Sequence, residues 1–427
     1  MRRGRATFKF EVSLESHPAQ RAREVCPSAS GSVPLSFAAM NVRFAMILAF
    51  VLSLFVYVGF RLADSFGTPV TIILMGILFG GFLSYRKIHG LKNPSARRFL
   101  IGAVHLEMGF LSFLLTFIIA RDLIFIPVGF VSPAISELAF SRSGTSIVIG
   151  LAIVSLFVGV AIANAGPWVL RVNVPIRDLP AELVGFTIAQ LSDMHIGPTT
   201  APELVERIVK TTMDLNPDMI ALTGDIGDGP YIESRDAISH LSGLCMKPTF
   251  YVTGNHEYYW NGPEWIGGFE AIGLKPLLNQ YDVIERGRAR VFVIGTPDPT
   301  ARMLGPKMVP DVALAVRTPA SGVDALPASP LVLGSARTDV RILLAHQPGI
   351  SGEALKAGID LQLSGHTHAG QFFPWTLVVK RVHEFSKGLG RLGSLSVYVN
   401  PGTGSWGPQV RLGTKTEITL LTLVKES

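Results

Sequence analysis

The sequence predicts two parts that fold in different solvents: a segment of membrane-spanning helices, followed by an α/β domain. Hydrophobic residues make up 48% of the 427 residues, and the mean hydropathy of +0.38 is too high for a purely soluble chain. This apolar excess lies before about residue 170, whereas the later residues alternate between short apolar runs and polar helical stretches. We therefore predict a disordered basic tail, a helical membrane region and an α/β domain over residues 1–39, 40–170 and 171–427.

Four stretches have about the length needed to cross a hydrocarbon core of roughly 30 Å. They are residues 44–60, 65–85, 99–120 and 143–170. A shorter fifth stretch, 123–136, contains two prolines and is expected to lie at the interface rather than to span. Glu107 lies within the third stretch, and we expect it to reach back to Arg97 or Arg98 at the membrane surface. The alternative is an ionisable group that lines a pathway.

Basic residues precede the first stretch and fill the loop after the second. Such loops stay in the cytoplasm, so four spans would return the chain there and place the α/β domain on the cytoplasmic side. The net charge of +6 comes largely from these loops, and no nucleic-acid partner is expected. Cys26 and Cys245 are too few for a disulfide framework. Met40, which begins a typical membrane-helix start, is an alternative first residue of the protein.

The region after residue 170 reads as strands alternating with helices. Residues 201–218 have Leu204, Ile208 and Val209 at helical spacing, with Pro202 where a first helical turn tolerates proline. This rhythm predicts a layered α/β architecture. The predicted strands are residues 186–191, 219–222, 249–252, 291–294, 340–344, 361–363, 395–399 and 418–423.

Five of these runs end in side chains of the kinds that bind metal ions. In an open α/β sheet, sites are built at the carboxyl ends of the strands. Strand residues i and i+2 point to one face, about 6–7 Å apart at the backbone, so they can converge on one centre. Each motif alone is more often a structural polar residue, but five in order after separate runs indicate a joint site. They contain Asp193 and His195 (SDMH), Asp225 and Asp228 (TGDIGD), Asn255 and His256 (TGNHE), His346 (AHQP), and His366 and His368 (SGHTH).

The motif series resembles that of the calcineurin-like metallophosphoesterase superfamily, which reads DxH, GDxxD, GNH, H and GHxH. The resemblance covers about residues 183–425. It implies a four-layer α/β/β/α sandwich with two divalent metal ions, Mn, Fe, Zn or Co, at the ends of two sheets.

The resemblance also implies a role for each motif residue. One metal ion would be held by Asp193, His195 and His368. The other would be held by Asn255, His346 and His366, and Asp225 would bridge the two ions. His256 would act catalytically near the leaving group, oriented by Asp228.

The apolar segment, GHTHAGQ and the C-terminal NPGTGSWGPQ are similar to the bacterial membrane-anchored branch of this family. A bacterial inner membrane, with the catalytic domain in the cytoplasm, is therefore expected. Ala369 stands where that branch usually has glycine, which matters only if the position needs a positive φ. Gly229 and Thr253 stand where protein serine/threonine phosphatases carry arginine, which disfavours that class.

The resemblance implies hydrolysis of a phosphate monoester or diester by a hydroxide that bridges the two metal ions. A membrane anchor favours a lipid-borne substrate, such as a phospholipid or a lipid-linked sugar phosphate. A soluble phosphomonoester or nucleotide is the alternative substrate. An alternative of another class is a membrane sensor or transporter that uses the domain only for binding. Asp298 and Arg411 are either cleft residues or ordinary loop residues, and residues 301–339 are expected to form a loop near the site.

Overall fold

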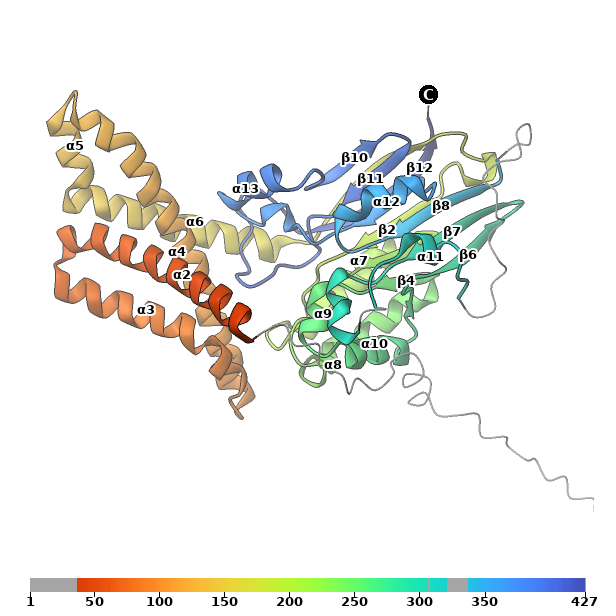
Figure 1. Cartoon of the computed structure of the whole chain (residues 1–427), viewed down its shortest axis with the longest axis horizontal. Helices are drawn as coiled ribbons and strands as arrows, with labels where there is room; N and C mark the ends of the chain where they lie inside the picture. The colour runs from red at the N-terminus through yellow and green to blue at the C-terminus, as the bar shows by residue number, and fades with distance from the viewer. Residues whose placement is uncertain (1–36, 306–307, 321–336, 427) are drawn as a thin grey trace, which may run out of the picture. The chain divides into compact units, whose positions relative to one another are not determined.

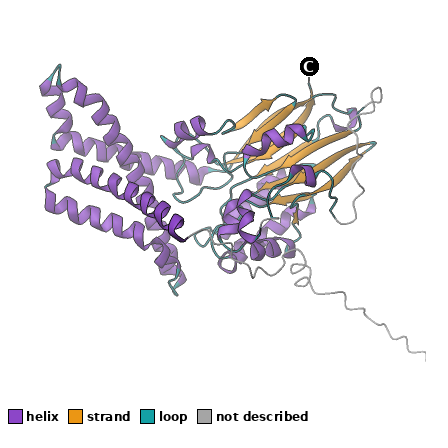
Figure 2. Cartoon of the chain, in the orientation of Figure 1, coloured by secondary structure: helices purple, strands orange, loops and turns teal. Residues whose placement is uncertain are grey.

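The computed structural model describes residues 37–305, 308–320 and 337–426. The described chain begins with long helices, and two β-sheets with their own helices follow (Figure 1). Figure 2 separates the helical part from the part that contains all the described strands. Most of the predicted tail lies outside the described residues, and the first described helix already begins at Phe37.

Four helices of the N-terminal part are long and apolar enough to cross a membrane, judged by length and composition. They are α2 (Phe37–Phe66), α3 (Thr68–His89), α4 (Pro94–Gly129) and α6 (Arg142–Ala165), and a short helix, α5 (Pro133–Phe140), precedes the last. The number of predicted spans is confirmed, but two boundaries differ. Helix α4 continues through Pro127 and takes up half of the stretch expected at the interface. Helix α6 ends at Ala165, before Gly166 and Pro167, so residues 168–170 belong to a strand.

The longer helices enclose charges that the predicted spans left outside. Nε of Arg61 on α2 lies 2.5 Å from Oδ2 of Asp122 on α4, and Tyr57 donates a hydrogen bond to the same oxygen. Arg121 lies 3.3 Å from the other oxygen of Asp122. Charges inside a helical bundle are stable only when they are paired in this way.

The expected contact of Glu107 with Arg97 or Arg98 is wrong. Arg97 pairs with Glu233 of the α/β domain at 2.9 Å, and Arg98 donates to the carbonyl oxygen of Pro198. Glu107 instead lines an apolar cavity of about 210 Å³ between α2, α3 and α4. The contacts of the two arginines join the start of α4 to the α/β domain, so this end of α4 and the domain lie on the same side of the candidate spans.

Two six-stranded mixed sheets form the centre of the α/β domain. In spatial order, the first sheet consists of β1 (Trp168–Ile176), β12 (Glu417–Lys425), β2 (Thr187–Leu191), β3 (Met219–Thr223), β4 (Thr249–Val252) and β5 (Lys275–Pro276). The second consists of β10 (Gly388–Leu392), β11 (Leu395–Val399), β9 (Leu361–Ser364), β8 (Asp339–Leu344), β7 (Ala289–Gly295) and β6 (Gln280–Arg286). All eight predicted strands are present.

The two sheets pack face to face, and helices cover their outer faces. Side chains such as Ile188, Val252 and Ile342 from both sheets share one apolar core between the layers. Alternate residues such as Leu191 face the helices on the other side of the first sheet. Those helices are α7 (Pro202–Asp214), α8 (Tyr231–Ser239), η2 (His240–Met246) and α10 (Gly262–Ala271). The second sheet is covered by α11 (Val312–Ala315) and α12 (Ser351–Lys356), which completes the predicted four-layer order.

The remaining described elements are short or carry site residues. They are α9 (Asn255–Tyr259), α13 (Trp375–Val382), and the 3-10 helices η1 (Ala181–Leu183), η3 (Pro299–Leu304), η4 (Pro348–Ile350) and η5 (His368–Gly370). Of the predicted loop 301–339, residues 306–307 and 321–336 lie outside the described part, and η3, α11 and the start of β8 occupy much of the rest.

Candidate metal centre

The predicted site residues follow five strands whose carboxyl ends share one edge of the sandwich. Strands β2, β3 and β4 run parallel in the first sheet, and β8 and β9 run parallel in the second. Parallel pairing puts the carboxyl ends of neighbouring strands side by side, so residues distant in sequence meet there.

Asp193, His195 and His368 form a buried group that we call the first cluster. Nε2 of His195 lies 3.0 Å from Nε2 of His368, and the latter lies 3.4 Å from Oδ1 of Asp193. One ligand atom from each residue lies within 4.8 Å of the others. This spacing allows the three atoms to contact one cation.

Asp225, His346 and His366 form the second cluster by the same measure. Oδ2 of Asp225 lies 3.2 Å from Nε2 of His346, which lies 3.3 Å from Nδ1 of His366. The same Asp225 oxygen is 3.9 Å from Nε2 of His195 in the first cluster. Asp225 therefore lies between the two clusters, where a bridging carboxylate would be needed.

Asn255 sits beside the second cluster, at the start of α9. Its Oδ1 atom is buried and accepts no hydrogen bond from the residues that the structure describes. An unpaired buried carbonyl oxygen is costly unless something else satisfies it. A metal ion at the second cluster would do so.

The donor set fits a pair of metal ions in two further respects. Nδ1 of His346 lies 2.8 Å from the carbonyl oxygen of Thr223, an arrangement in which the imidazole donates from Nδ1 and keeps Nε2 free as a ligand. Burial lowers the pKa of His366 to about 3 and the pKa of His368 well below its usual value, so both rings are neutral. Buried clusters of neutral histidine and aspartate are typical of dimetal phosphoesterase sites.

Backbone geometry at the site is strained. Asp193, His195, Asp225, His366 and His368 all have φ between 48° and 70°, a region that non-glycine residues seldom adopt. Such strain is tolerated where surrounding contacts fix the backbone, and it clusters at functional sites.

Two glycines of the motifs have a clear steric reason. A Cβ atom on Gly224, where φ is +85°, would lie 2.6 Å from Nδ1 of His346. A Cβ atom on Gly254 would lie 2.1 Å from Oδ1 of Asp225. Any larger residue at either position would push a cluster side chain out of place.

His256 and Asp228 lie at the edge of the first cluster. Nδ1 of His256 is 2.9 Å from Oδ1 of Asp228, whose other oxygen is 3.4 Å from Nδ1 of His195. Burial lowers the pKa of His256, but the hydrogen bond and charge of Asp228 and the charge of Asp225 outweigh burial and raise the pKa to about 9. Trp260 donates from Nε1 to the same Asp228 oxygen at 2.9 Å, a contact that the sequence did not predict.

Glu257 is a second residue that sequence reasoning missed. Its buried carboxylate accepts four backbone hydrogen bonds, three from residues 225–227 and one from Gly254. Burial and the nearby charge of Asp225 raise the pKa of Glu257 to about 7. The glutamate ties the loop after β3 to the loop after β4. Its place in GNHE was the available signal, and the partners of its oxygens could not be read from the sequence.

Arg411 and Asp298 do not line a cleft. Arg411 is fully buried, and its guanidinium donates to the carbonyl oxygens of Pro401, Gly404 and His368. Its Nη2 atom also lies 3.3 Å from Nδ1 of His368. Asp298 caps the start of η3 and accepts a hydrogen bond from Gln347.

The segment that carries Arg411 is joined to the membrane helices. The backbone N–H of Arg411 donates to the carbonyl oxygen of Gly159 on α6 at 2.9 Å. Val410 is fully buried, and a Cβ atom on Gly159 would come within 2.5 Å of it. Val410 also packs beside Gly109 on α4. The first cluster is thus backed by a contact chain that runs from α6 through Arg411 to His368.

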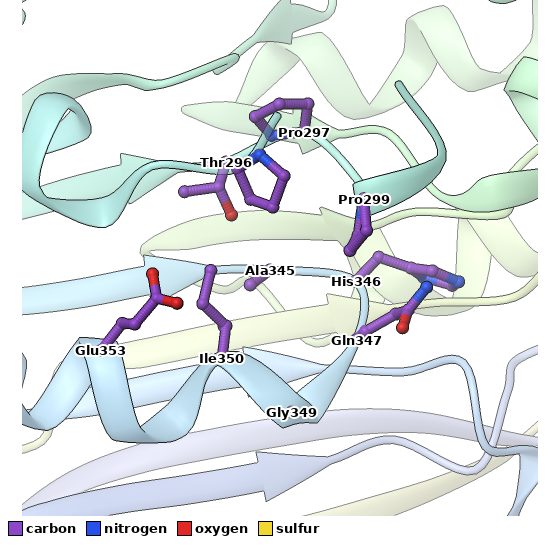
Figure 3. Close-up of a pocket in the computed structure, with 10 residues that line it drawn as sticks. Thr296, Pro297, Pro299, Ala345, His346, Gln347, Gly349, Ile350 and Glu353 are labelled. Atoms are coloured by element: carbon purple, nitrogen blue, oxygen red, sulfur yellow. The ribbon is translucent and has the colours of Figure 1, made fainter. Parts of the chain in front are cut away.

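Two cavities adjoin the clusters. A cavity of about 320 Å³ lies between His195 and the end of α6, where Ala163 and Asn164 form part of its wall. A smaller one, of about 180 Å³, adjoins His346. Figure 3 shows the smaller cavity, with Pro297 and Pro299 on one side and Glu353 on the other. Only the larger cavity has a wall made by a candidate span.

Comparisons with known proteins agree with the site. Residues 186–370 match the family model described as calcineurin-like phosphoesterase. The chain is 34% identical over 304 residues to a "Transmembrane protein with metallophosphoesterase domain" from Danio rerio, an alignment that covers 68% of this chain and 66% of that protein. The protein of the same name from Bos taurus is 34% identical over 277 residues, covering 62% of this chain and 59% of that protein.

A bacterial relative is covered more fully. An uncharacterized metallophosphoesterase from Campylobacter jejuni is 30% identical over 281 residues, which cover 64% of this chain and 69% of that protein. The chain spans about three fifths to two thirds of the length of the two animal relatives. With the family model matched across the predicted motifs, this chain belongs to the calcineurin-like metallophosphoesterase family.

Proposed function

We propose that the chain is a membrane-anchored, metal-dependent hydrolase of phosphate esters. The observation that carries the proposal is the convergence of both clusters on Asp225, which lies within 3.9 Å of nitrogen atoms in each. Buried carboxylates and imidazoles from four strand ends would serve no packing purpose at this spacing. A role confined to binding, as in a sensor or transporter, is disfavoured because no member of the ligand set is missing.

Two divalent ions, chosen from Mn, Fe, Zn and Co, would polarise a phosphoryl oxygen and lower the pKa of water toward neutrality. We assign Asp193, His195 and His368 to one ion. We assign Asn255, His346 and His366 to the other, with Asp225 shared.

Residues of the chain itself would protonate the leaving group. Asp228 holds the ring of His256 at Nδ1, which leaves Nε2 available as a donor for the departing ester oxygen. Trp260 holds Asp228 in place. We infer that His256 is the catalytic acid and that Asp228 is its positioning residue.

For the substrate, we favour a lipid-borne phosphate ester, such as a phospholipid or a lipid-linked sugar phosphate. The support is the cavity beside His195, because residues at the end of a candidate span form part of its wall. A soluble phosphomonoester or nucleotide is the second candidate.

We also infer that the catalytic domain faces the cytoplasm. The basic start of α4 contacts this domain through Arg97 and Arg98, and positively charged residues next to a span stay inside. The relatives with "transmembrane" in their names are animal proteins, and bacterial relatives also match. Assignment to the bacterial membrane-anchored branch and to a bacterial inner membrane therefore stays a prediction.

The test uses the full chain in lipid nanodiscs, loaded with Mn²⁺. We expect hydrolysis of p-nitrophenyl phosphate or bis(p-nitrophenyl) phosphate, and none with the Asp225→Asn variant purified in the same way. Protein that binds metal but cleaves neither ester would overturn the proposal and favour a binding module.

A further inference from the structure

Helix α13 (Trp375–Val382) exposes an apolar surface beside the metal centre. None of its eight residues is buried. The last turn carries Lys380 and Arg381. A helix with an apolar face and basic residues is typical of one that lies in the plane of a membrane interface. The helical repeat of 3.6 residues places Leu377 between Lys380 and Arg381 on the basic side. The apolar face, between 46% and 71% exposed, consists of Trp375, Val378 and Val382.

The start of α13 contacts α4, a candidate span of 36 residues, which is longer than the roughly 20 residues that a crossing needs. A crossing by about the last 20 residues, up to Gly129, places Ser112 near the inner end of the span. Nε1 of Trp375 donates to the hydroxyl of Ser112 on α4 at 2.9 Å. Just before the helix, Phe372 shares an apolar cluster with Phe113 of α4. Tryptophan concentrates at the level where hydrocarbon meets lipid headgroups, because its ring is apolar and its N–H is polar. The exposed face of α13 is therefore continuous with a surface that belongs in lipid.

Both ends of α13 are also tied to the loop that carries His366 and His368. At the first end, a Cβ atom on Gly370 would lie 2.4 Å from the carbonyl group of Trp375, so the helix begins directly against this loop. At the other end, the ring of His383 packs edge-on to that of His366, with their centroids 6.3 Å apart. The position of α13 is thus fixed relative to both clusters.

We propose that α13 lies in the headgroup region of the bilayer and holds the metal centre at the level of lipid-borne phosphate esters. The occupant of its apolar face is the bilayer itself, and Lys380 and Arg381 match the charge of anionic headgroups. The substrate half of this inference rests on the proposed hydrolase function. The membrane contact does not, because it follows from α13 and α4 alone.

The membrane contact is tested without catalysis. The full chain, with Cys26 and Cys245 replaced by serine, carries a bimane label at Val382→Cys, a position 71% exposed on the apolar face, in nanodiscs that contain phosphatidylglycerol. Doxyl-labelled lipids are expected to quench this label strongly, and iodide in the water weakly. The matched control is Met246→Cys on η2, a residue that is 76% exposed on another element. At this position iodide should quench the label strongly and doxyl lipid weakly.

Each other result of this labelling counts against the proposal. If the label at Val382 is as open to iodide as the label at Met246, α13 lies in water. If it is shielded from iodide but not quenched by doxyl lipid, a protein surface covers it, either a second copy of this chain or another partner.

The substrate half is tested with two esters that share one reacting centre. They are p-nitrophenyl methyl phosphate, which stays in water, and p-nitrophenyl hexadecyl phosphate, which enters the bilayer. For the Val378→Asp/Val382→Asp variant, the ratio of kcat/KM for the hexadecyl ester to that for the methyl ester should fall about tenfold or more, because two apolar side chains that face the bilayer become charged. Met246→Asp should leave the ratio unchanged.

The labelling and kinetic experiments distinguish a failure of the proposed hydrolase function from a failure of the substrate half of this inference. Wild-type protein that cleaves neither of these diesters nor p-nitrophenyl phosphate overturns the hydrolase function, while the quenching experiment remains readable. Cleavage of p-nitrophenyl phosphate alone keeps the hydrolase function and overturns the substrate half. An unchanged ratio in the α13 variant, with both esters cleaved, overturns the substrate half alone.

Discussion

The two clusters of the metal centre are built from the same residue types but are held by different neighbours. In the first cluster, His368 contacts Arg411, whose backbone is bonded to Gly159 of membrane helix α6. In the second, His346 bonds to the carbonyl oxygen of Thr223, at the end of β3 in the opposing sheet. The comparison teaches that the second cluster depends on the sandwich alone, whereas the first also depends on the packing of the membrane helices.

The largest effect should come from the residue that the two clusters share. Asp225→Asn keeps the size of the side chain but removes the charge that a bridging ligand needs, so activity should fall to background. Elemental analysis should also find less than the two ions that the site is expected to hold. His240→Asn, which changes a histidine outside both clusters, is the control and should retain activity. Two bound ions with normal turnover in Asp225→Asn would refute the shared role.

A change beside the first cluster should separate chemistry from metal holding. His256→Ala removes the proposed acid, so kcat should fall roughly 10²- to 10⁴-fold while both metal ions stay bound. The loss should be larger for esters with poor leaving groups than for p-nitrophenyl esters, because only the former need a proton. Steady-state kinetics on both kinds of ester check this. Unchanged kcat on a poor leaving group would remove His256 from its assigned role.

A substitution in a membrane helix should weaken the first cluster only. In Gly159→Val the added side chain would collide with Val410, displace Arg411 and release His368. One of the two metal dissociation constants should rise 10- to 100-fold, the range for lost support of a ligand, while the other stays the same. Metal titration of the full chain in nanodiscs measures both.

This substitution has two controls. Gly150→Val lies on the same helix in open space and should bind metal normally. Val410→Ala should restore metal affinity when combined with Gly159→Val, because the smaller alanine leaves room for the added valine side chain. Wild-type affinity at both sites in Gly159→Val alone would mean that α6 does not support the first cluster.

The smallest effect concerns strain next to the first cluster. Ala369 follows His368 with φ of 51°, so this position does have the positive φ for which glycine is suited. Ala369→Gly should raise the free energy of unfolding by about 0.5 kcal/mol, since relief of about 1–2 kcal/mol of strain exceeds the entropy lost by glycine. Thermal unfolding of metal-loaded protein should show a small rise in Tm.

The control for Ala369→Gly is Ala357→Gly, at a position with φ of −80°. There glycine relieves no strain, and stability should drop slightly. A shift of the same sign in both variants would mean that Ala369 is not strained.

The sandwich was predictable because its strands are buried on both faces. Strands such as β4 and β11 are mostly apolar, are buried along their whole length and have the predicted boundaries. The four strands missed, β1, β5, β6 and β10, all lie at the outer positions of their sheets and are partly exposed, so their sequences carry no continuous apolar signal. The length of helix α4 was underestimated because the charges of Arg121 and Asp122 indicated the end of a span. In the structure these two residues are paired with each other inside the helical bundle.

By itself, the sequence determined the four candidate spans, the layered α/β domain and the residue types that gather at its strand ends. These features follow from local periodicity and from the i, i+2 geometry of strands, which need no knowledge of distant partners. Only the tertiary structure decided that Glu257 ties two loops together, that Trp260 holds Asp228, and that Arg411 joins His368 to α6. Each of these contacts depends on where a polar group finds a partner far along the chain, and a single sequence does not record those partners.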